Sequence, residues 1–366
     1  MRRGSVLSRV FQHAPGRGKA AAQGRRGNLV AQVLGGAWRA APPPSDLGGP
    51  GWDAIAALLL GTGCGGLGWW RVCGTPLRTS SAGLQLQQAY RLQTVLAALH
   101  ERQLVQLLHV LHSAGVEPVV IKGWAVAHLY PEPGLRPYGD HDLCVRPGQH
   151  GTATAAVKAL RAEGCPVDLH AGIALLEDRP AEEVWRRARV VGIGEEQVRV
   201  LGPEDQLRHL CWHLLDHGAW RPLWLCDIAV ALEARPRDFD WDYFRRGWRR
   251  RSEGVACALA LAGRLLGVRL EDAPFSRSAR TLPQWLVGSV LRQWGEGYRH
   301  REPLAYHLRA GSGVLESLRR SWPDPIKATV GVGAPFNAFP RWPFQLAQCA
   351  KRAAQIAVEL SRPASR

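Results

Sequence analysis

Three aspartates stand in two short runs that alternate acidic and apolar residues. Asp140 and Asp142 flank His141 in the run DHDL, and Asp168 lies in the run VDLH. In a β-strand, residues two apart project from the same face, so Asp140 and Asp142 are expected to point the same way. Neighbouring carboxylates repel one another unless a cation lies between them. An isolated DxD is also typical of solvated turns, but the third aspartate favours a metal site.

Neighbouring strands would bring Asp140, Asp142 and Asp168 together. Three carboxylates suit a hard divalent ion, and Mg²⁺ or Mn²⁺ is the expected cofactor because these ions take oxygen ligands and bridge phosphates. Two such ions can clamp a phosphoryl centre, one at the leaving oxygen and one at the attacking hydroxyl. The predicted chemistry is therefore metal-dependent transfer to a hydroxyl group, with the three aspartates as catalytic residues and metal ligands.

Four more residues are candidates for contacts with a phosphate or nucleotide. Lys122 and Gly123 lie where the apolar run VVI changes to a helical pattern, and backbone amides at such a turn attract phosphate. Arg136, in the loop before DHDL, is interpreted either as a phosphate ligand or as a surface arginine. His170 is interpreted either as a substrate contact beside Asp168 or as a core histidine.

Several other residues have less specific patterns. His209, His213 and His217 recur every four residues, which could hold zinc on a helix, although no HExxH motif accompanies them. A polar stripe that faces the cleft or solvent is the preferred interpretation. Asp227 either reaches the cleft or pairs within its own helical region. Two aromatic residues are expected to pack rather than to stack on a base, and these are Trp124 and Tyr130.

The elements that must position these residues are expected to form a mixed sheet. Alternating and β-rich runs predict the strands 118–121, 143–146 and 167–170, the last continuing through 173–176, and a hairpin of 189–193 with 198–201. Periods of three and four predict the helices 124–130, 152–163, 204–217, 223–234, 241–250, 254–266, 284–294 and 345–360. Before the sheet, DAIAALLLG and then one or two long amphipathic helices up to Gly115 are expected. The stretch 321–344 is expected to be an ordered loop.

The predicted fold is therefore α+β, a small mixed sheet with flanking helices between two helical parts. The expected domains are a disordered basic tail over 1–50, a helical segment over 51–116, an α/β core over 117–202 and a helical domain over 203–360. The tail is predicted because no acidic residue precedes Asp46 and because glycine, proline and alanine are abundant there.

Charge does not single out a nucleic-acid partner. The net charge is +16 and arises mainly from arginine, with only five lysines. The arginines are spread along the chain, whereas a nucleic-acid interface usually gathers basic and aromatic residues in one stripe. The eight cysteines form no CxxC pair, which indicates neither a zinc site nor a disulfide framework, so a reducing cytoplasm is expected. No apolar run is long enough for a transmembrane span.

The motifs resemble those of the polymerase-beta-like nucleotidyltransferase superfamily, which has a glycine turn, a DxD strand and a third carboxylate on a following strand. More closely, KGWAVAHLYPEPGLRPYGDHDLCV and VDLHAG look like a group of bacterial nucleotidyltransferase family proteins with KG, DxDLLV and VDLHW motifs. The similarity is specific in these motifs and looser over roughly residues 55–350. It implies that an NTP, ATP being favoured, donates a nucleotide to a hydroxyl acceptor and releases pyrophosphate. The acceptor is left open between a small molecule such as an antibiotic, a peptide or protein hydroxyl, and a sugar.

Two departures from the family pattern affect the expected substrate. The usual Gly-Ser after the first strand is Gly123-Trp124 here, so the phosphate contact of the serine is missing, and Lys122 or backbone amides are expected to replace it. The aromatic residue that follows DLH in the family is Ala171. Both departures leave the reaction class unchanged.

Three other classes of protein share parts of this pattern. VVIK mimics the lysine strand of a protein kinase, but no GxGxxG motif precedes it and no HRD loop follows it. A glycosyltransferase could use the same DxD to bind a nucleotide-sugar, although a nucleotide-binding α/β domain normally precedes that motif. A non-catalytic nucleotide-binding protein is the third, and the presence of all three carboxylates argues against it.

Overall fold

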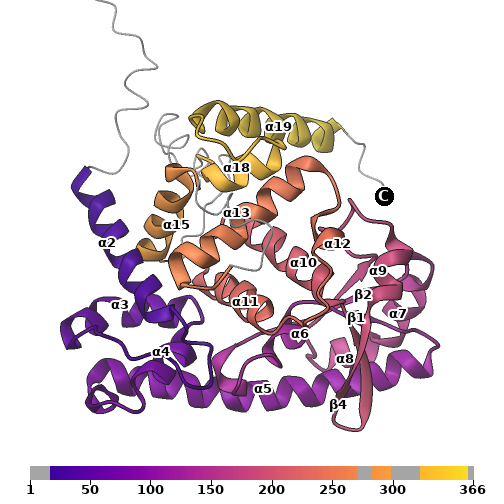
Figure 1. Cartoon of the computed structure of the whole chain (residues 1–366). Coiled ribbons are helices and arrows are strands. Elements are labelled where there is room, and N and C mark those ends of the chain that lie inside the picture. The colour runs from indigo at the N-terminus through magenta and orange to yellow at the C-terminus, as the bar shows by residue number, and fades with distance from the viewer. Residues whose placement is uncertain (1–16, 271–281, 298–321, 362–366) are drawn as a thin grey trace, which may run out of the picture.

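The computed structural model describes residues 17–270, 282–297 and 322–361 (Figure 1). They form a mainly helical α+β fold around one mixed sheet, which confirms the predicted fold class. The strands are β1 (Val119–Val120), β2 (His141–Val145), β3 (Val167–Ala171), β4 (Arg189–Ile193) and β5 (Glu196–Val200).

The sheet has the strand order β3-β2-β1-β5-β4. β3 runs parallel to β2, and β5 runs parallel to β1, whereas β1 and β2 are antiparallel. β4 and β5 form the predicted antiparallel hairpin. The predicted extension of the third strand through 173–176 is wrong, because Gly172 and Leu175 adopt left-handed φ angles of 85° and 70° that end the strand at Ala171.

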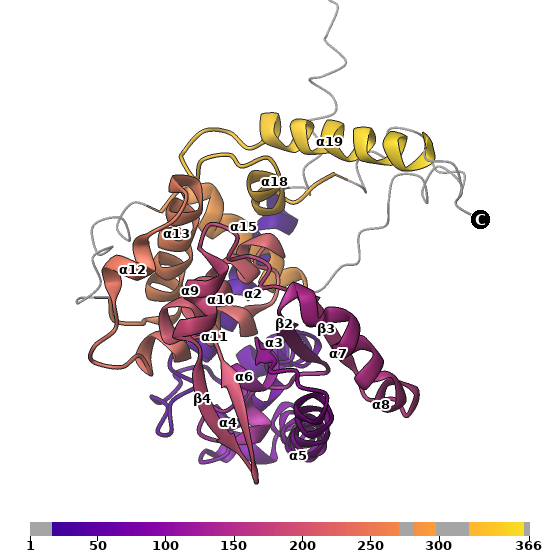
Figure 2. The ribbon, with the colours of Figure 1, turned by 90° about the vertical axis from the view of Figure 1, so that its right-hand side faces the viewer.

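Helices surround the sheet and fill the rest of the molecule (Figures 1 and 2). Before and between the strands lie α2 (Arg17–Leu34), α3 (Gly49–Gly61), α4 (Gly65–Val72), η1 (Pro76–Thr79), α5 (Ser81–Ser113), α6 (Gly123–Ala127), η2 (Pro133–Leu135), η3 (Pro147–Gln149), α7 (His150–Ala156), α8 (Lys158–Ala162) and α9 (Ala181–Arg187). After the strands lie α10 (Pro203–Asp216), α11 (Pro222–Glu233), α12 (Trp241–Arg245), α13 (Arg249–Leu266), α15 (Gln284–Glu296), α18 (Pro325–Gly331) and α19 (Trp342–Ser361).

Two faces of the sheet are covered by different helices. On one face, Leu143 and Val145 of β2 pack in a core that includes leucines of α5. On the other face, Cys144 packs near Val184 and Trp185 of α9. The alternation along β2 thus sends odd and even residues into separate cores, as a pleated strand requires. Asp142 therefore shares the face of Cys144.

The helical parts on either side of the sheet in sequence build one large core. Buried residues from α3, such as Trp52 and Leu59, belong to the same cluster as Leu210 of α10 and Leu225 of α11. The described strands all lie between Val119 and Val200. Among the described helices, none is both long and apolar enough to cross a membrane.

The expectation of a disordered tail over 1–50 is wrong for the part that the structure describes. Residues 17–34 form α2, and Val33 and Leu34 are fully buried in the large core. α2 crosses α15 closely, because a Cβ atom at Gly27 or at Gly295 would collide with the backbone of the other helix. Glycines that the composition suggested as signs of disorder instead permit close helix packing. Residues 1–16 lie outside the described part of the chain.

Other helix boundaries also differ from the sequence prediction. The helix expected over 152–163 is divided into α7 and α8 at Val157, and the helix expected over 241–250 ends at Arg245. The expected loop over 321–344 contains α18, since the side chain of Asp324 accepts hydrogen bonds from the amides of Ile326 and Lys327. Asp-Pro at a helix start is a capping signal that the proline-rich composition concealed.

Candidate active site

Asp142 and Asp168 lie side by side on two parallel strands. The register of β2 and β3 pairs Asp142 directly with Asp168, so both side chains leave the same face of the sheet. Asp142 is buried, whereas the side chain of Asp168 is 59% exposed. The predicted convergence of these two carboxylates is present in the fold, with one in the protein interior and one open to solvent.

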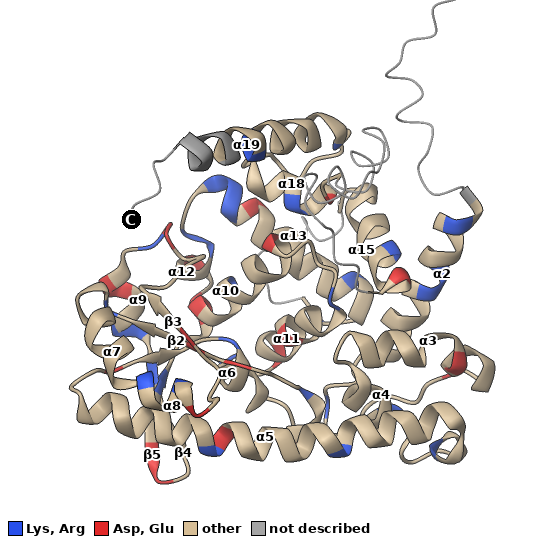
Figure 3. Ribbon diagram, turned by 180° about the vertical axis from the view of Figure 1, so that it is seen from behind, with Lys and Arg blue, Asp and Glu red and all other residues tan. Residues whose placement is uncertain are grey.

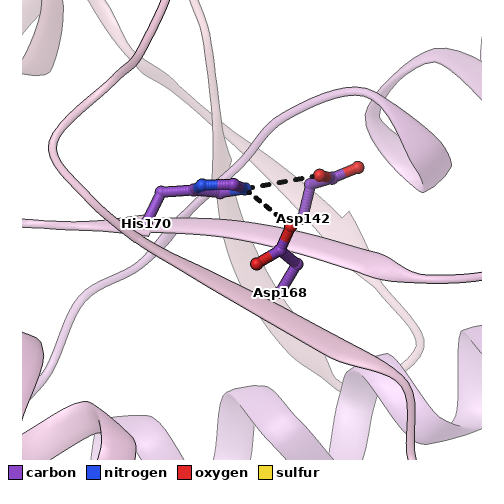
Figure 4. Close-up of side chains that lie close together, drawn as sticks. All are labelled: Asp142, Asp168 and His170. Atoms are coloured by element: carbon purple, nitrogen blue, oxygen red, sulfur yellow. Dashed lines mark hydrogen bonds and ion pairs between the residues drawn. The ribbon is translucent and has the colours of Figure 1, made fainter. Parts of the chain in front are cut away.

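His170 joins the two carboxylates. It follows Asp168 by two residues and therefore projects from the same face of β3 (Figure 4). Its Nε2 atom lies 3.4 Å from Oδ1 of Asp142 and 3.4 Å from Oδ2 of Asp168. The ligand atoms of these three residues lie within 4.8 Å of one another, and in the described part of the chain no other set of His, Cys, Asp and Glu residues meets that spacing. His170 thus stands in the candidate metal site itself.

Asp140 does not belong to this group in the structure. It lies at an exposed bend immediately before β2 begins, so the two-residue alternation that ties Asp142 to Cys144 does not extend to it. It remains near the group, however. Partial loss of solvation beside the site raises the pKa of Asp140, although the residue is exposed, and the negative charges of Asp142 and Asp168 add to this increase.

The turn between β1 and α6 holds a lysine against the group. Lys122 has a φ angle of 53°, which is unusual for a residue with a side chain, and Gly123 has a φ angle of 36°. This backbone path directs the ammonium nitrogen of Lys122 to 2.7 Å from Oδ1 of Asp142. A Cβ atom at Gly123 would lie 3.3 Å from the carbonyl oxygen of Asp140, so glycine permits the turn to pass close to the DxD. The turn and the two strands therefore form one site.

The sequence suggested two roles for Arg136, a phosphate ligand or a surface arginine. The structure shows neither of these roles. Arg136 is buried and donates two hydrogen bonds to Asp227 of α11, from Nε at 3.2 Å and from Nη2 at 2.8 Å. The hydroxyl of Tyr130 donates to the same carboxylate at 2.9 Å. Asp227 therefore anchors the loop before β2 to the helical part of the molecule. Tyr130 packs as predicted, and the second predicted packing residue, Trp124, is also buried.

His209 and His213 of α10 and His217, the residue that follows the end of α10, form a row beside the site. His209 is buried, and its ring stacks on that of His213 with centroids 6.4 Å apart, while His217 follows at 4.3 Å from His213. Burial lowers the pKa of His209 to about 3, and the nearby charges of Lys122 and His170 contribute to the decrease. The row packs against Trp224 of α11, and the ring of His213 lies edge-on to the ring of Trp224 with centroids 4.8 Å apart. The three histidines are not among the described residues that are spaced to hold a metal ion.

Two residues near the site were not singled out from the sequence. Cys144 shares the face of Asp142, but burial raises its pKa to about 12, which keeps the thiol protonated and unreactive. Arg221 immediately precedes α11 and donates from Nε to the carbonyl oxygen of Thr62 at 2.8 Å. Burial lowers the pKa of Arg221, and the charge of Asp140 opposes that decrease. The sequence offers one signal for Arg221, its place directly before Pro222, the proline at which α11 begins.

The donor set fits a small, hard divalent cation. Two carboxylates and one imidazole converge, and the ammonium of Lys122 already places one positive charge against Asp142. Mg²⁺ prefers the oxygen ligands, and Mn²⁺ also accepts imidazole nitrogen. Asp142, Asp168 and His170 are therefore the residues that would hold such an ion, with Asp140 beside them.

Comparison with known proteins places these residues in context. A family model described as "Uncharacterised nucleotidyltransferase" matches residues 50–170 and 158–267, which together span more than half of the chain. The matched ranges contain the turn at Lys122, both carboxylates, His170 and the histidine row. No curated protein and no solved structure matches the sequence.

Proposed function

The chain belongs to the family of uncharacterised nucleotidyltransferases, and from this premise we propose that it transfers a nucleoside monophosphate from an NTP to a hydroxyl acceptor. Pyrophosphate is the second product, and ATP is the proposed donor. The observation that supports this proposal most directly is the convergence of Asp142, Asp168 and His170 beside Lys122. Bound Mg²⁺ or Mn²⁺ would supply Lewis-acid stabilisation of the phosphoryl oxygens and of the leaving pyrophosphate.

Individual residues of the chain bind the substrate and accept the proton in this proposal. Lys122 attracts the triphosphate, and the backbone at Gly123 gives the phosphates a close approach. The acceptor oxygen forms a bond to the α-phosphorus while the bond from that phosphorus to the pyrophosphate oxygen breaks. Asp168, whose side chain is open to solvent, receives the proton of the acceptor hydroxyl. Arg136 enters only indirectly, by fixing the loop before β2 through Asp227.

The histidine row is proposed to form one wall of the substrate site. Burial lowers the pKa values of His209, His213 and His217, which favours neutral rings. Neutral imidazoles beside Trp224 offer hydrogen bonds and a flat apolar surface without adding charge. Such a wall suits a neutral acceptor or a nucleobase better than a second polyphosphate.

The test is an incubation of the protein with each labelled NTP, Mg²⁺ or Mn²⁺ and a panel of hydroxyl acceptors. Pyrophosphate release that disappears in Asp142→Asn supports the proposal. Transfer of the γ-phosphate would identify a kinase, and turnover of nucleotide-sugars would identify a glycosyltransferase. If NTP raises the melting temperature but is neither transferred to any acceptor nor slowly hydrolysed by water, the result would favour a nucleotide-binding protein.

A reducing cytoplasmic location is proposed on independent grounds. All eight cysteines lie in the described part of the chain, and none forms a disulfide. Five of them are buried, where a thiol is an ordinary apolar core residue. Fractionation of the native host with detection of the protein would test this proposal.

A further inference from the structure

The long helix α5 buries one face and leaves part of another face open to solvent. Leu86 lies in the large helical core, and Leu104, Leu107, Leu108 and Leu111 are fully buried against the sheet. Near the middle of the helix, four aliphatic residues on a different face remain open to solvent. Their exposed fractions are 59% for Leu92, 68% for Val95, 38% for Leu96 and 49% for Leu99.

These four residues, here called the α5 stripe, lie on one face of the helix. Leu92 and Leu99, seven residues apart, lie in line along the helix, and Val95 and Leu96 lie on either side of that line, about 100° apart around the axis. Figures 1 and 3 show α5 as a rod along one edge of the molecule, and Figure 3 shows few charged residues along its length. Isolated exposed leucines are common, but a continuous apolar line on an otherwise polar helix surface indicates an interaction surface.

The residues at the two ends of the α5 stripe indicate what it contacts. Leu92 and Leu99 lie at equal distances along the helix from the midpoint between Val95 and Leu96. The next positions on the same face are glutamines at both ends, and these are Gln88 and Gln103, then Gln85 and Gln106. The face therefore has an apolar centre, amide ends and no charged residue, and it reads the same in both directions.

We propose that the α5 stripe binds the α5 stripe of a second copy of this chain, with the two helices antiparallel. A two-fold axis at the midpoint then brings each copy of Val95 against the other and each Leu96 against the other. Leu92 meets the second copy's Leu99. The glutamines at opposite ends meet as amide pairs, in which each side chain can both donate and accept. Such isologous pairing is the commonest form of homodimer.

A second copy fits this face better than an unrelated partner, because the polarity pattern is complementary to itself. An acidic or basic peptide would find no opposite charge on the stripe. The nearest charges are Arg91 and Arg102, which flank it on one side. In the antiparallel arrangement Arg91 of one copy lies near Arg102 of the other at the rim. Their repulsion opposes association, so added salt strengthens the dimer through screening.

The size of the contact sets the expected affinity. One pair of helices buries less surface than a standard interface of about 1,600 Å², so the dimer is expected to dissociate in the micromolar range. Sedimentation velocity over about 5 to 200 µM protein should show a monomer–dimer equilibrium with a dissociation constant on the order of 10 µM. The full-length chain is used throughout, and neither activity nor nucleotide binding is a readout, so this inference is independent of the proposed function.

Charge substitutions on the two-fold axis test the arrangement. Val95→Lys or Val95→Glu alone places two like charges against each other and should weaken association at least about 10-fold. An equimolar mixture of the two variants should restore it. Phe339→Lys is the matched control, because Phe339 is also 68% exposed but lies between α18 and α19, and it should dimerise like the wild type. Arg102→Glu should tighten the dimer by pairing with Arg91.

The outcomes separate the possibilities. Circular dichroism and the melting temperature of each variant confirm that it is folded. A wild type that is monomeric at 200 µM, or a dimer that Val95→Lys leaves unchanged, overturns the proposal. A mixture of the two Val95 variants that stays monomeric excludes pairing across this axis. Association that falls with salt would show that an ionic surface, and not the α5 stripe, joins the copies.

Discussion

The ammonium nitrogen of Lys122 lies 2.7 Å from a carboxylate oxygen of Asp142, and this ion pair joins the turn after β1 to the start of β2. Both partners are restricted. Lys122 is held in a backbone conformation that L-residues rarely adopt, and the side chain of Asp142 is only 7% exposed. A strained residue beside a buried carboxylate is typical of functional sites, where the surrounding structure maintains the strain.

Two substitutions at Lys122 separate its charge from its backbone. Lys122→Gly and Lys122→Ala both remove the ammonium, so both are expected to raise the KM for NTP by about 10-fold, since a charge-assisted phosphate contact is lost. Only glycine suits the positive φ angle, so Lys122→Ala should be less stable than Lys122→Gly by about 1 kcal/mol. Steady-state kinetics and urea unfolding measure the two effects. An unchanged KM in both variants would remove Lys122 from the site.

Asp142→Asn and Asp168→Asn are each expected to reduce nucleotidyl transfer by at least about 1,000-fold, which corresponds to about 4 kcal/mol of transition-state stabilisation. Each variant loses a carboxylate charge that a divalent ion requires. The same variants should lose the rise in melting temperature that Mn²⁺ produces in the wild type. Asp242→Asn is the control, because its side chain is 92% exposed on α12, and it should retain both properties.

His170→Ala tests whether the imidazole belongs to the metal site or only lies near it. If His170 is a ligand, the variant should bind Mn²⁺ at least about 10-fold more weakly, as followed by the paramagnetic resonance of free Mn²⁺. Its Mg²⁺ affinity should change less, because Mg²⁺ prefers oxygen. Equal Mn²⁺ affinity in wild type and variant would contradict a ligand role.

The ion pair between Arg136 and Asp227 is expected to be essential for stability. Arg136→Met or Asp227→Asn leaves a buried group without its partner and should reduce the free energy of unfolding by about 3–5 kcal/mol. Tyr130→Phe removes one hydrogen bond to the same carboxylate and should cost about 1 kcal/mol. The double variant Arg136→Met/Asp227→Asn should be more stable than the sum of the single changes predicts, because the unpaired charge is gone. Additive losses in urea unfolding would disprove coupling.

His209 predicts a specific dependence of stability on pH. Its pKa is about 3 in the folded protein, below the ordinary value of 6.5, so the unfolded chain binds the extra proton between these values. The contribution of His209 is complete above pH 6.5 and decreases by about 1.4 kcal/mol per unit as the pH falls below it. Asp205 acts in the opposite direction, since burial raises its pKa to about 6, and the folded state then gains stability as the pH falls below 6.

Comparison with His209→Gln isolates the histidine from Asp205. Urea unfolding of both proteins at pH 7.5, 6.5, 5.5 and 4.5 gives the difference in their free energies of unfolding. That difference should be constant from pH 7.5 to 6.5 and should move in favour of the variant below pH 6.5. A difference that does not vary with pH would show that His209 gains its proton equally in both states.

Much of the candidate site could be predicted because it is encoded by short-range spacing. A two-residue period places Asp168 and His170 on one face of β3, and a β-rich run followed by Lys-Gly indicates the turn. The prediction was weakest at Asp140, because the period applies only inside a strand and β2 begins one residue later. The exact start of a strand depends on its pairing with neighbouring strands, which local sequence specifies poorly.

The amino-acid sequence by itself determined the α+β class, the positions of the strands along the chain and the placement of an aspartate in β2 and another in β3. Only the tertiary structure decided that Arg136 is bound by Asp227, 91 residues away, and that α2 packs on α15. It also decided that Leu104 and Leu107 of α5 are buried while Leu92 and Val95 of the same helix, at a similar apolar spacing, are exposed. The physical reason is that local spacing sets which residues share a face, whereas burial depends on which distant segment comes to cover that face.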